Sequence, residues 1–390
     1  MYSWYSVSIL DWCLIGALAL VFLFQVYFYA RYMAAPARKI RHDKKAHPPD
    51  IHLTSTSVSP RGVSVIVCAR NEGRNIEDYL QALLTQDYPL YEVIVVDDSS
   101  EDNTSAVIDS YLSRDARVRT TFVPREARVG SSKKLALTLA AKAAKYDYLL
   151  LTDADCRPES TRWISEMMGG FADPQTEVVL GYGAYFRDHA KVNRLVRFDT
   201  LFNGLHYLGA AICRHPYMGV GRNLAYRKST FFESGGFSHL MNEQTGDDDL
   251  FVNHVATRQN TAVVVSRDSF TWSVSKQTLR DWLQQKRRHL SVSPKYRAST
   301  KFRLAVEPVT RGLFYALLIA IGVCGSPVSW IVAATLFGAR LLMQMLIIDI
   351  SALRMGLSRF GLSILWYDIC LPLISLYMLI IQPLRPKMRW

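Results

Sequence analysis

Two carboxylates close a buried apolar stretch near the middle of the chain. Residues 148–156 read YLLLTDADC, so three leucines lead into Asp153 and Asp155 with a single alanine between them. Side chains at alternate positions of an extended chain lie on one face, where two unpaired carboxylates would repel each other. One aspartate is enough to start a turn after a strand. The spacing therefore indicates a cation between the carboxylates, and a capped loop is the simpler alternative for this motif taken alone.

Polar groups also follow two earlier apolar stretches. GVSVIVCAR leads into polar residues at 70–72, and YEVIVVDDSS ends with Asp97 and Asp98. From Arg61 to about Thr300, strand-like stretches alternate with stretches of helical periodicity such as NIEDYLQALLTQ. This alternation predicts an α/β fold, a parallel sheet with helices on both faces. Ligands bind beyond the carboxyl ends of such strands, so we expect the three polar ends to form one site.

The stretches VSVIVCARNEGRNI, VIVVDDSSEDNT and LLLTDADC, taken in this order, resemble the opening motifs of family 2 glycosyltransferases. The resemblance covers roughly residues 61–290, and the flanking apolar segments are similar to those of membrane-integrated members. It implies a Rossmann-like A-type glycosyltransferase fold that binds a nucleotide sugar. It also implies transfer with inversion at the sugar carbon.

A nucleotide diphosphate sugar explains the carboxylate pair chemically. Its phosphates are negative, and cleavage of the sugar–phosphate bond adds charge to the leaving group. Mg²⁺ or Mn²⁺ neutralises such charge as a Lewis acid and prefers carboxylate oxygens. Asp155, and less directly Asp153, are the predicted metal ligands. The residues that the resemblance places at the nucleotide sugar are Arg70, Glu72, Asp97, Asp98, Lys133, Asp153, Gln285 and Arg288.

Two basic motifs extend this donor site. Lys133 in SSKKLAL matches the family's lysine before Ala-Leu, while the alternative, represented by Lys134, is a solvated charge at a helix start. DWLQQKRRHL resembles the family's Gln-x-x-Arg-Trp motif, in which Arg288 pairs with the diphosphate as a planar fork. His289 replaces the tryptophan that holds the acceptor in processive synthases, which puts elongation in doubt. Trp272, Trp282 and the basic run also suit an interfacial amphipathic helix.

Three consecutive aspartates, Asp247 to Asp249, occur in NEQTGDDDLFVN. They can cap a helix that begins near Leu250, although one aspartate suffices for that. The resemblance implies a general base here, which transfer to a hydroxyl acceptor needs. Matching Gly-Asp-Asp selects Asp248 and the spacing to Leu250 selects Asp247. We favour Asp248 and keep Asp247 as the alternative.

The stretch MGVGRNLAYRK at 218–228 lacks the third glycine of a dinucleotide fingerprint and has no strand signal before it. We expect it on the acceptor side of the site. Asn223 and His289 are the predicted acceptor contacts.

Residues 9–30 are apolar apart from Asp11 and Gln25, and are long enough to cross a bilayer. No charged residue precedes them, and six lysines and arginines follow within residues 31–45. The positive-inside rule therefore places the N-terminus outside and the chain from residue 31 in the cytoplasm.

The C-terminal part is also membrane-like. Residues 328–349 and 362–382 have the length of a span, and 312–324 is short unless its helix starts near Pro308. We expect four spans in total, although this leaves the basic tail outside, against the rule. A re-entrant 312–324 is the alternative, with the tail inside. Arg340 should face protein or snorkel.

The expected organisation has four parts: an N-terminal transmembrane helix (1–33), a basic, proline-rich linker (34–60), a cytoplasmic glycosyltransferase domain (61–300) with an interfacial helix near 276–292, and a C-terminal membrane region of about three helices (301–390). The net charge of +12 is concentrated near the membrane flanks and 280–303. It suits anionic lipid and anionic substrates better than nucleic acid. The six cysteines contain no CxxC pair, so neither a zinc site nor a disulfide framework is expected.

These features together predict a metal-dependent hexosyltransferase in a bacterial inner membrane, active in the cell envelope. It would move a sugar from a UDP-sugar to a lipid or lipid-linked hydroxyl at the cytoplasmic face. One alternative is a processive polysaccharide synthase. Another is a polyprenyl-phosphate sugar synthase, whose ionised acceptor needs no base and leaves the aspartate triplet idle. A non-catalytic, nucleotide-sugar-binding membrane scaffold would need the loss of one carboxylate set, and both sets are present.

Overall fold

The computed structural model describes residues 7–46, 61–127, 132–241, 243 and 245–381. Residues 47–60 of the expected linker and the basic tail from residue 382 lie outside these ranges. The chain divides into two compact units, one formed by residues 1–37 with 296–390 and the other by 38–295. The first is helical and the second is α/β.

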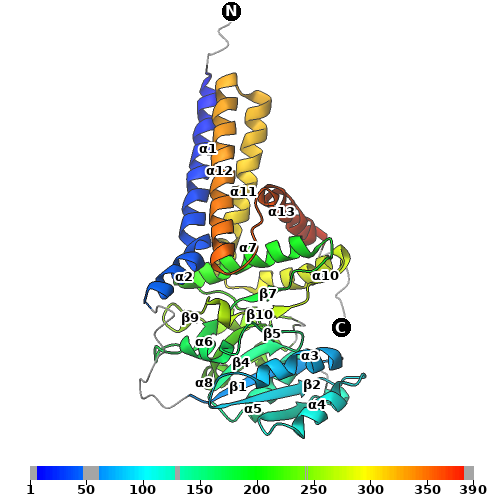
Figure 1. Ribbon diagram of the computed structural model, residues 1–390. Coiled ribbons are helices and arrows are strands. Elements are labelled where there is room, and N and C mark those ends of the chain that lie inside the picture. The colour runs from blue at the N-terminus through cyan, green and yellow to red at the C-terminus, as the bar shows by residue number, and fades with distance from the viewer. Residues whose placement is uncertain (1–6, 47–60, 128–131, 242, 244, 382–390) are drawn as a thin grey trace, which may run out of the picture. The chain divides into compact units, whose positions relative to one another are not determined.

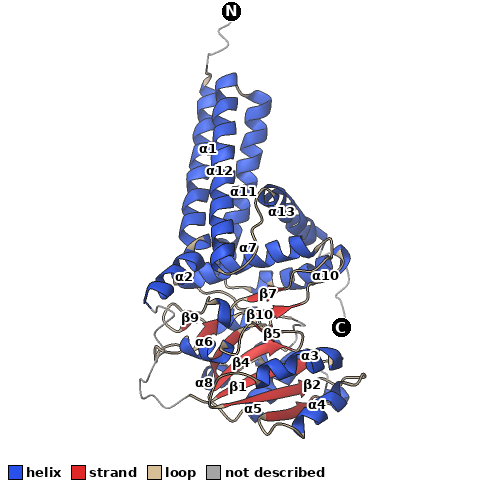
Figure 2. Cartoon of the chain, viewed as in Figure 1, coloured by secondary structure: helices blue, strands red, loops and turns tan. Residues whose placement is uncertain are grey.

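A seven-stranded sheet forms the centre of the α/β unit (Figures 1 and 2), in the order β3-β2-β1-β4-β8-β6-β9. Its strands are β1 (Val63–Ala69), β2 (Tyr91–Asp97), β3 (Val118–Phe122), β4 (Tyr148–Asp153), β6 (Val178–Leu180), β8 (Leu224–Arg227) and β9 (Thr261–Val263). β1 to β4 are parallel, and β8 runs antiparallel to both β4 and β6. The predicted mostly parallel sheet is confirmed.

Helices cover both faces of this sheet, as predicted. Val63, Val65 and Val67 of β1 share one core cluster with residues of α3 (Gly73–Leu84), α4 (Thr104–Leu112) and α6 (Trp163–Gly169). α5 (Ser132–Ala143) packs on β1 and β2, and none of its described residues belongs to that cluster. α5 therefore covers the opposite face. Because both faces are covered, β1, β2 and β4 are buried along most of their length and largely apolar rather than alternating, whereas the edge strand β3 is mostly exposed.

A three-stranded sheet and further helices complete the α/β unit. They are β5 (Arg157–Pro158), β7 (Gly183–Tyr185), β10 (Thr271–Ser273), α7 (Asn193–Ile212), α8 (Lys228–Glu233), α9 (Asp249–Val255) and α10 (Leu279–Leu290). α10 is the helix expected at the interface. Its Trp282 is buried, and Lys286 lies 5.5 Å over that ring and pairs with Asp199 of α7. The Lys286–Asp199 pair joins α10 to α7, and the buried Trp282 offers no ring to lipid, so this part of the interfacial interpretation is not met while the rest stays a prediction.

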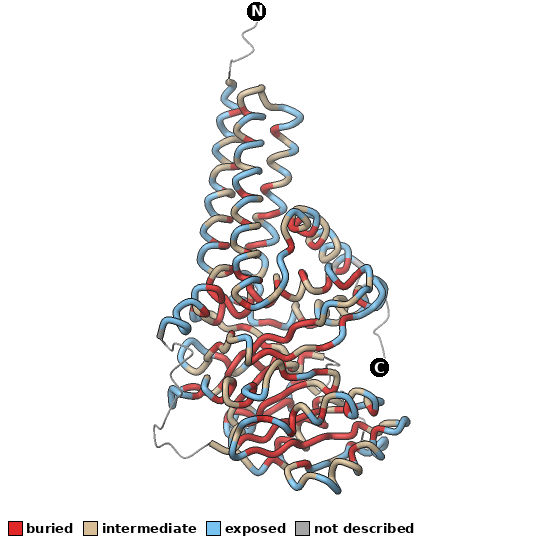
Figure 3. The backbone as a smooth tube through the Cα atoms, viewed as in Figure 1, coloured by how far each residue is buried: buried red, intermediate tan, exposed pale blue. Residues whose placement is uncertain are grey.

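The helical unit consists of α1 (Ile9–Phe28), a π-helical turn (Tyr29–Met33), the beginning of α2 (Ala35–Ala46), α11 (Ala298–Cys324), α12 (Pro327–Arg354) and α13 (Ser363–Ile381). Figure 3 shows buried positions along the long helices interspersed with exposed ones. Leu18, Phe314, Ile321 and Ala333 form part of the apolar core between them.

Three helices of the described residues are long and apolar enough to cross a membrane, namely Ile9–Lys45, α11 and α12. The prediction of a span at 9–30 agrees with α1. The short stretch at 312–324 belongs to a helix that starts well before Pro308, so its length is sufficient. The expected fourth span falls on α13, an apolar helix of 19 residues. Within the described residues its apolar stretch, Ser363–Met378, belongs with the shorter apolar helices, so the count of four stays a prediction.

Candidate active site

The register of the central strands puts the three polar strand ends side by side. Ala69, the last residue of β1, pairs with Asp97 of β2, and Cys68 pairs with Asp153 of β4. Parallel strands in this register deliver the residues that follow them to one edge of the sheet. The predicted convergence of the three strand ends is therefore present.

The first two loops at this edge are tied to each other. The Asn71 amide nitrogen donates to Ser100 Oγ (3.0 Å), and the Glu101 amide nitrogen donates to Asn71 Oδ1 (2.8 Å). Asn71 and Ser99 have φ values of 54° and 50°. Residues other than glycine rarely adopt this left-handed conformation, and it is concentrated at functional sites. The exposed Arg70 precedes the first of these positions.

The two aspartates of the second loop are both buried. Asp97 shapes the loop, since its Oδ1 accepts from the Ser100 amide nitrogen (2.9 Å) and its Oδ2 from the Ser105 hydroxyl (2.5 Å). The Asp98 amide nitrogen donates to the Ala69 carbonyl at 2.8 Å, which holds the loop against β1. Contacts of Asp97 and Asp98 with the nucleotide remain predictions.

Lys133 links the DAD motif to the aspartate triplet. Its Nζ lies 3.0 Å from Asp153 Oδ1 and 3.3 Å from Asp247 Oδ2. Partial burial opposes the charge on Lys133, but the two carboxylates outweigh it and raise the pKa of the ammonium well above its usual range. The two carboxylate sets, almost a hundred residues apart in the chain, thus meet around one permanent cation.

The DAD motif has the groups that a hard divalent cation requires. The potential donor atoms of Asp153, Asp155 and Cys156 all lie within 4.8 Å of one another. Burial and the neighbouring Asp153 raise the pKa of Asp155, so a cation at this point would relieve an unfavourable charge.

Cys156 and Glu72 complete the surroundings of that pair. Burial and Asp155 raise the pKa of the Cys156 thiol well above its usual range, which keeps it protonated, and Sγ donates to Asp155 Oδ1 at 3.4 Å. The carboxylate oxygens of Asp153 and Asp155 are the hard donors that Mg²⁺ or Mn²⁺ prefers over a thiol. Burial, followed by Asp155 and Asp153, also raises the pKa of Glu72, which places this carboxyl group near the pair.

Two aspartates of the triplet have different roles, since Asp248 caps a helix and Asp247 forms an ion pair. Asp248 is the N-cap of α9, with Oδ2 accepting from the Gly221 amide nitrogen (2.7 Å) and Oδ1 from that of Asp249 (2.8 Å). Burial and Asp247 raise the pKa of Asp248. Burial also opposes ionisation of Asp247, but Lys133 lowers the pKa of that carboxyl below its ordinary value. The helix-cap alternative thus holds for Asp248 and leaves Asp247 unexplained by capping.

Lys134 is not a solvated charge, and that alternative is wrong. Its side chain is fully buried, and Nζ donates to the carbonyls of Glu243 (2.6 Å) and Thr245 (2.8 Å). These carbonyls belong to the chain that leads into the aspartate triplet. The two adjacent lysines of α5 therefore have different roles. Lys133 places a positive charge beside the carboxylates of the site, and Lys134 fixes the loop at residues 243 and 245 through hydrogen bonds.

Replacing Lys134 with methionine should lower the free energy of unfolding by about 1.5–3 kcal/mol, because two buried carbonyls lose a charged donor. Lys133→Met is the matched control one residue away. It should change the unfolding free energy much less and reduce transfer directly. Thermal unfolding and initial rates measured on both variants test this division, and equal melting temperatures for the two variants would contradict it.

Gln285 and Arg222 meet on one aromatic ring. Gln285 Nε2 donates to the Tyr185 hydroxyl at 3.1 Å, and the Arg222 guanidinium lies 4.3 Å from the centre of the same ring. Arg222 also donates to the carbonyls of Gly183 (3.1 Å) and Ala184 (3.3 Å). Its charge acts on Asp155 and Asp153. Sequence reasoning missed Arg222. The chain gave no hint of its role except that it directly precedes Asn223, a predicted acceptor contact.

His289 and Arg288 lie on α10 close to this arginine. Desolvation by the surrounding side chains, together with the cations Arg288 and Arg222, lowers the pKa of His289 to about 4, although the residue keeps an exposed surface. The ring is therefore neutral at physiological pH. It can hydrogen-bond an uncharged hydroxyl, which agrees with the predicted acceptor contact without testing it.

Asn223, the other predicted acceptor contact, is fully buried. Its Nδ2 donates to the carbonyls of Tyr182 (3.0 Å) and Ser269 (2.7 Å), and its Oδ1 accepts from Trp163 Nε1 (3.1 Å). Every polar atom of the side chain is engaged in joining parts of the fold. This arrangement argues against a contact with the acceptor, which would have to break these bonds.

Comparison with known proteins shows which family this chain resembles. The profile of glycosyl transferase family 21 matches residues 21–390. Poly-beta-1,6-N-acetyl-D-glucosamine synthase of Staphylococcus epidermidis is 35% identical over 95 residues, which are 24% of this chain and 22% of that protein. Glycosyltransferase GlyG of Streptococcus pneumoniae is 29% identical over 93 residues, which are 24% of this chain and 30% of that protein. The chain thus spans less than a third of the length of these relatives.

A solved structure resembles this one over almost its full length. It is the mannosyltransferase PcManGT from Pyrobaculum calidifontis in complex with GDP-Man and Mn²⁺, with a TM-score of 0.57 and 19% identity. The likeness covers 94% of this chain and 99% of that one. The predicted A-type glycosyltransferase fold is thereby confirmed.

Proposed function

The chain belongs to glycosyl transferase family 21, which is related to family 2, and on that premise we propose that it moves a sugar from a UDP-sugar to a lipid or lipid-linked hydroxyl. The observation that carries the proposal is the bridge made by Lys133 between Asp153 and Asp247. It brings a metal-binding pair and a candidate base into one site. A transferase needs both, because one group leaves the sugar while another attacks it.

On the donor side, Asp155 and Asp153 would hold Mg²⁺ or Mn²⁺, which supplies Lewis-acid stabilisation of the leaving diphosphate when bound. Lys133 keeps its proton at physiological pH and adds a fixed positive charge beside the carboxylates. Arg222 and Arg288 extend the positive charge toward α10, where a planar guanidinium can hold phosphate oxygens in pairs. These side chains together balance the charge that develops as the sugar leaves.

On the acceptor side, Asp248 is the proposed general base of an inverting transfer. A carboxylate whose pKa is raised holds a proton more firmly than an ordinary one, which suits it to accept the proton of a hydroxyl. Asp247 is the weaker candidate, because its ion pair with Lys133 lowers its pKa. The two N–H groups that hold Asp248 orient both of its oxygens.

A lipid acceptor is supported by the presence of three membrane-length helices in the same chain. The basic residues that follow the first of them support a cytoplasmic α/β unit. The bacterial origin of the relatives supports a bacterial inner membrane. His289 offers a smaller and more polar surface than tryptophan for stacking a sugar, so we propose transfer of one sugar or very few.

A processive polysaccharide synthase is the second candidate, and the similarity to a poly-N-acetylglucosamine synthase over 95 residues favours it. Purified protein in lipid vesicles, incubated with labelled UDP-sugars and GDP-mannose, separates the candidates by product size. We expect a product that extracts with lipid and carries one or a few sugars. A long polymer made by this chain alone would refute the proposal, and donor binding without turnover across the panel would favour the scaffold.

A further inference from the structure

The long helices of the helical unit are joined by polar contacts at one end. Asp11 Oδ1 accepts hydrogen bonds from the Ser326 amide nitrogen (2.8 Å) and from Ser329 Oγ (2.6 Å). These contacts tie the start of α1 to the turn between α11 and α12. At the other end, the Arg354 guanidinium donates to the Ala37 carbonyl at 3.0 Å. The three helices therefore share a common level at the Asp11 end, and α12 meets the continuation of α1 at the other end.

Polar residues recur at matched depths between these ends. Gln25 of α1, Arg311 of α11 and Arg340 of α12 each lie about four turns, or about 21 Å, from the Asp11 end. One turn further on lie Tyr29, Glu307 and Gln344. A hydrocarbon core of about 30 Å that begins near Asp11 would contain both levels in its inner half. All six residues are buried.

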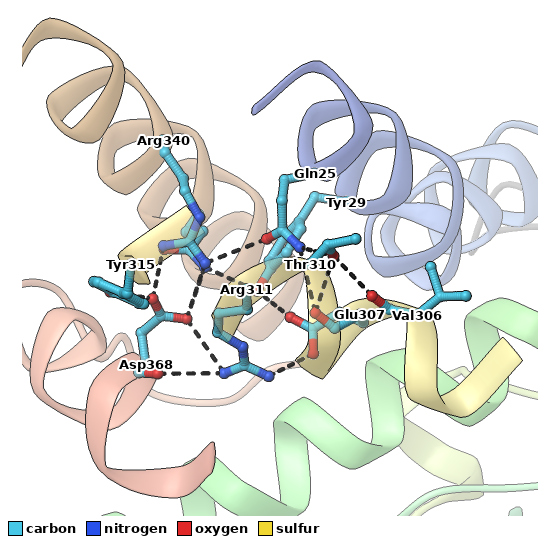
Figure 4. A network of polar contacts seen from close by, with 10 residues as sticks. Gln25, Tyr29, Val306, Glu307, Thr310, Arg311, Tyr315, Arg340 and Asp368 are labelled. Carbon is cyan, nitrogen blue, oxygen red and sulfur yellow. Dashed lines mark hydrogen bonds and ion pairs between the residues drawn. The ribbon is translucent and has the colours of Figure 1, made fainter. Parts of the chain in front are cut away.

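These residues form one polar network, drawn in Figure 4. Arg340 Nη2 donates to Gln25 Oε1 (3.2 Å), and Gln344 Nε2 donates to the Tyr29 hydroxyl (2.8 Å). Arg311 pairs with Glu307 one turn away on the same helix. The expectation that Arg340 faces protein is confirmed, because only 1% of the residue is exposed.

The fourth helix, α13, contacts this network through one of its described residues, Asp368. Asp368 of α13 pairs with Arg340 (2.7 Å) and with Arg311 (3.3 Å). It also accepts from Gln344 Nε2 (2.9 Å) and the Tyr315 hydroxyl (2.6 Å). Arg311 has Glu307 as a second partner, whereas among the described residues Asp368 is the one acid that pairs with Arg340.

The charges of the network balance only when α13 is in place. Arg311 and Arg340 are matched by Glu307 and Asp368, so the four charges sum to zero. Without Asp368, the three long helices would hold an uncompensated positive charge at membrane depth, which is costly. Ion pairs of this kind are strongly destabilised by the loss of one partner. The network therefore favours a docked α13.

α13 does not run along the long helices. Figure 1 shows it lying obliquely beside part of the bundle of α1, α11 and α12. Within the described residues its apolar stretch, Ser363–Met378, is shorter than those of the three long helices. We propose that Asp368 latches α13 onto the three spanning helices as a helix that enters the membrane without crossing it. The chain from Met355 to Ile381 then begins and ends on the cytoplasmic side.

The distribution of basic residues supports this topology. With four spans, the arginines and lysine after Ile381 would lie outside, against the positive-inside rule. With α13 latched and not crossing, they lie on the same side as Arg354 and Arg359 and as the basic run after residue 31. The conflict that the sequence posed is thereby removed, and the proposal is independent of the sugar chemistry.

Charge balance provides the first test. Asp368→Asn and Arg340→Gln should each lower the apparent melting temperature of the detergent-purified protein by about 5–10 °C. The double variant should recover most of the loss, because Glu307 and Arg311 then remain as a neutral pair. Wild-type stability of Asp368→Asn, or a double variant no better than the sum of the single losses, would overturn the latch. If a single variant fails to accumulate, recovery of yield in the double variant is the readout.

Asp11→Asn is the matched control, since it removes a carboxylate of the same unit that pairs with hydroxyl and amide groups rather than with a cation. Combining it with Arg340→Gln should add the two losses without recovery. Recovery in that combination would mean that total charge, and not the pairing at α13, determines stability.

Membrane topology of the unmutated chain provides the second test. A fluorescent protein that matures only in the cytoplasm should fluoresce when it is fused after the last residue. An alkaline phosphatase that is active only outside should be inactive there and active at the N-terminus. Phosphatase activity at the C-terminal end would show that α13 crosses, and would overturn the proposal even if the charge test succeeded.

Discussion

Replacing Asp155 with asparagine should lower the rate of sugar transfer at least about 10³-fold, which corresponds to the several kcal/mol that a bound Lewis acid contributes. Asp155 lies just beyond β4, and among the described residues its side chain accepts a weak hydrogen bond from the Cys156 thiol. The loss of its charge therefore removes a metal ligand and leaves the packing of the sheet in place. Initial rates at increasing Mn²⁺ concentration, together with a circular dichroism spectrum, separate a metal defect from a folding defect.

Cys156→Ser is the matched control for that experiment. Because the thiol is protonated and donates to Asp155, a serine hydroxyl can replace it, and we expect less than about a 10-fold change in rate. Near wild-type turnover of Asp155→Asn in membranes treated with EDTA would refute the metal role. A large effect of Cys156→Ser on the metal concentration needed would instead identify the sulfur as a ligand.

Asp248→Asn should lower the rate of transfer by about 10²–10⁴-fold, which is the usual contribution of a general base. Asparagine is as good an N-cap as aspartate, so α9 should remain formed. Donor affinity should change little. The matched variant Asp247→Asn, which removes the partner of Lys133, should act mainly through donor binding and raise KM more than it lowers kcat.

The pH dependence of the rate provides a sharper readout. A base acts when it is deprotonated, so transfer is lost as the pH falls through the pKa of that base. Because burial and Asp247 raise the pKa of Asp248, this loss should begin at a higher pH than for an ordinary aspartate, and Asp248→Asn should abolish it. If Asp247→Asn abolishes it instead, the assignment is off by one residue. If both variants keep the wild-type rate, the triplet serves only as a helix cap.

The sequence by itself determined the features that depend on local order along the chain. Alternating apolar stretches with strand and helix periods predicted the layered α/β unit, since each period reports which face of a segment is buried. The rule that parallel strands end at one edge then brought residues 70–72, Asp97 and Asp153 together. The register of β1, β2 and β4 bears this out. The first membrane helix was predictable from the length of its apolar run. The cost of a charge in lipid left two placements open for Arg340, facing protein or snorkelling, and the structure shows the first.

The tertiary structure alone decided which distant groups meet. No pattern in the chain indicates that Lys133 pairs with Asp247, that Lys134 holds the carbonyls of 243 and 245, or that Arg222 stacks on Tyr185. These contacts depend on how segments pack against one another, and a charged residue looks the same in sequence whether it is solvated or buried. Asp368 is the clearest case, because one aspartate in an apolar stretch acquires its partners only when four helices come together.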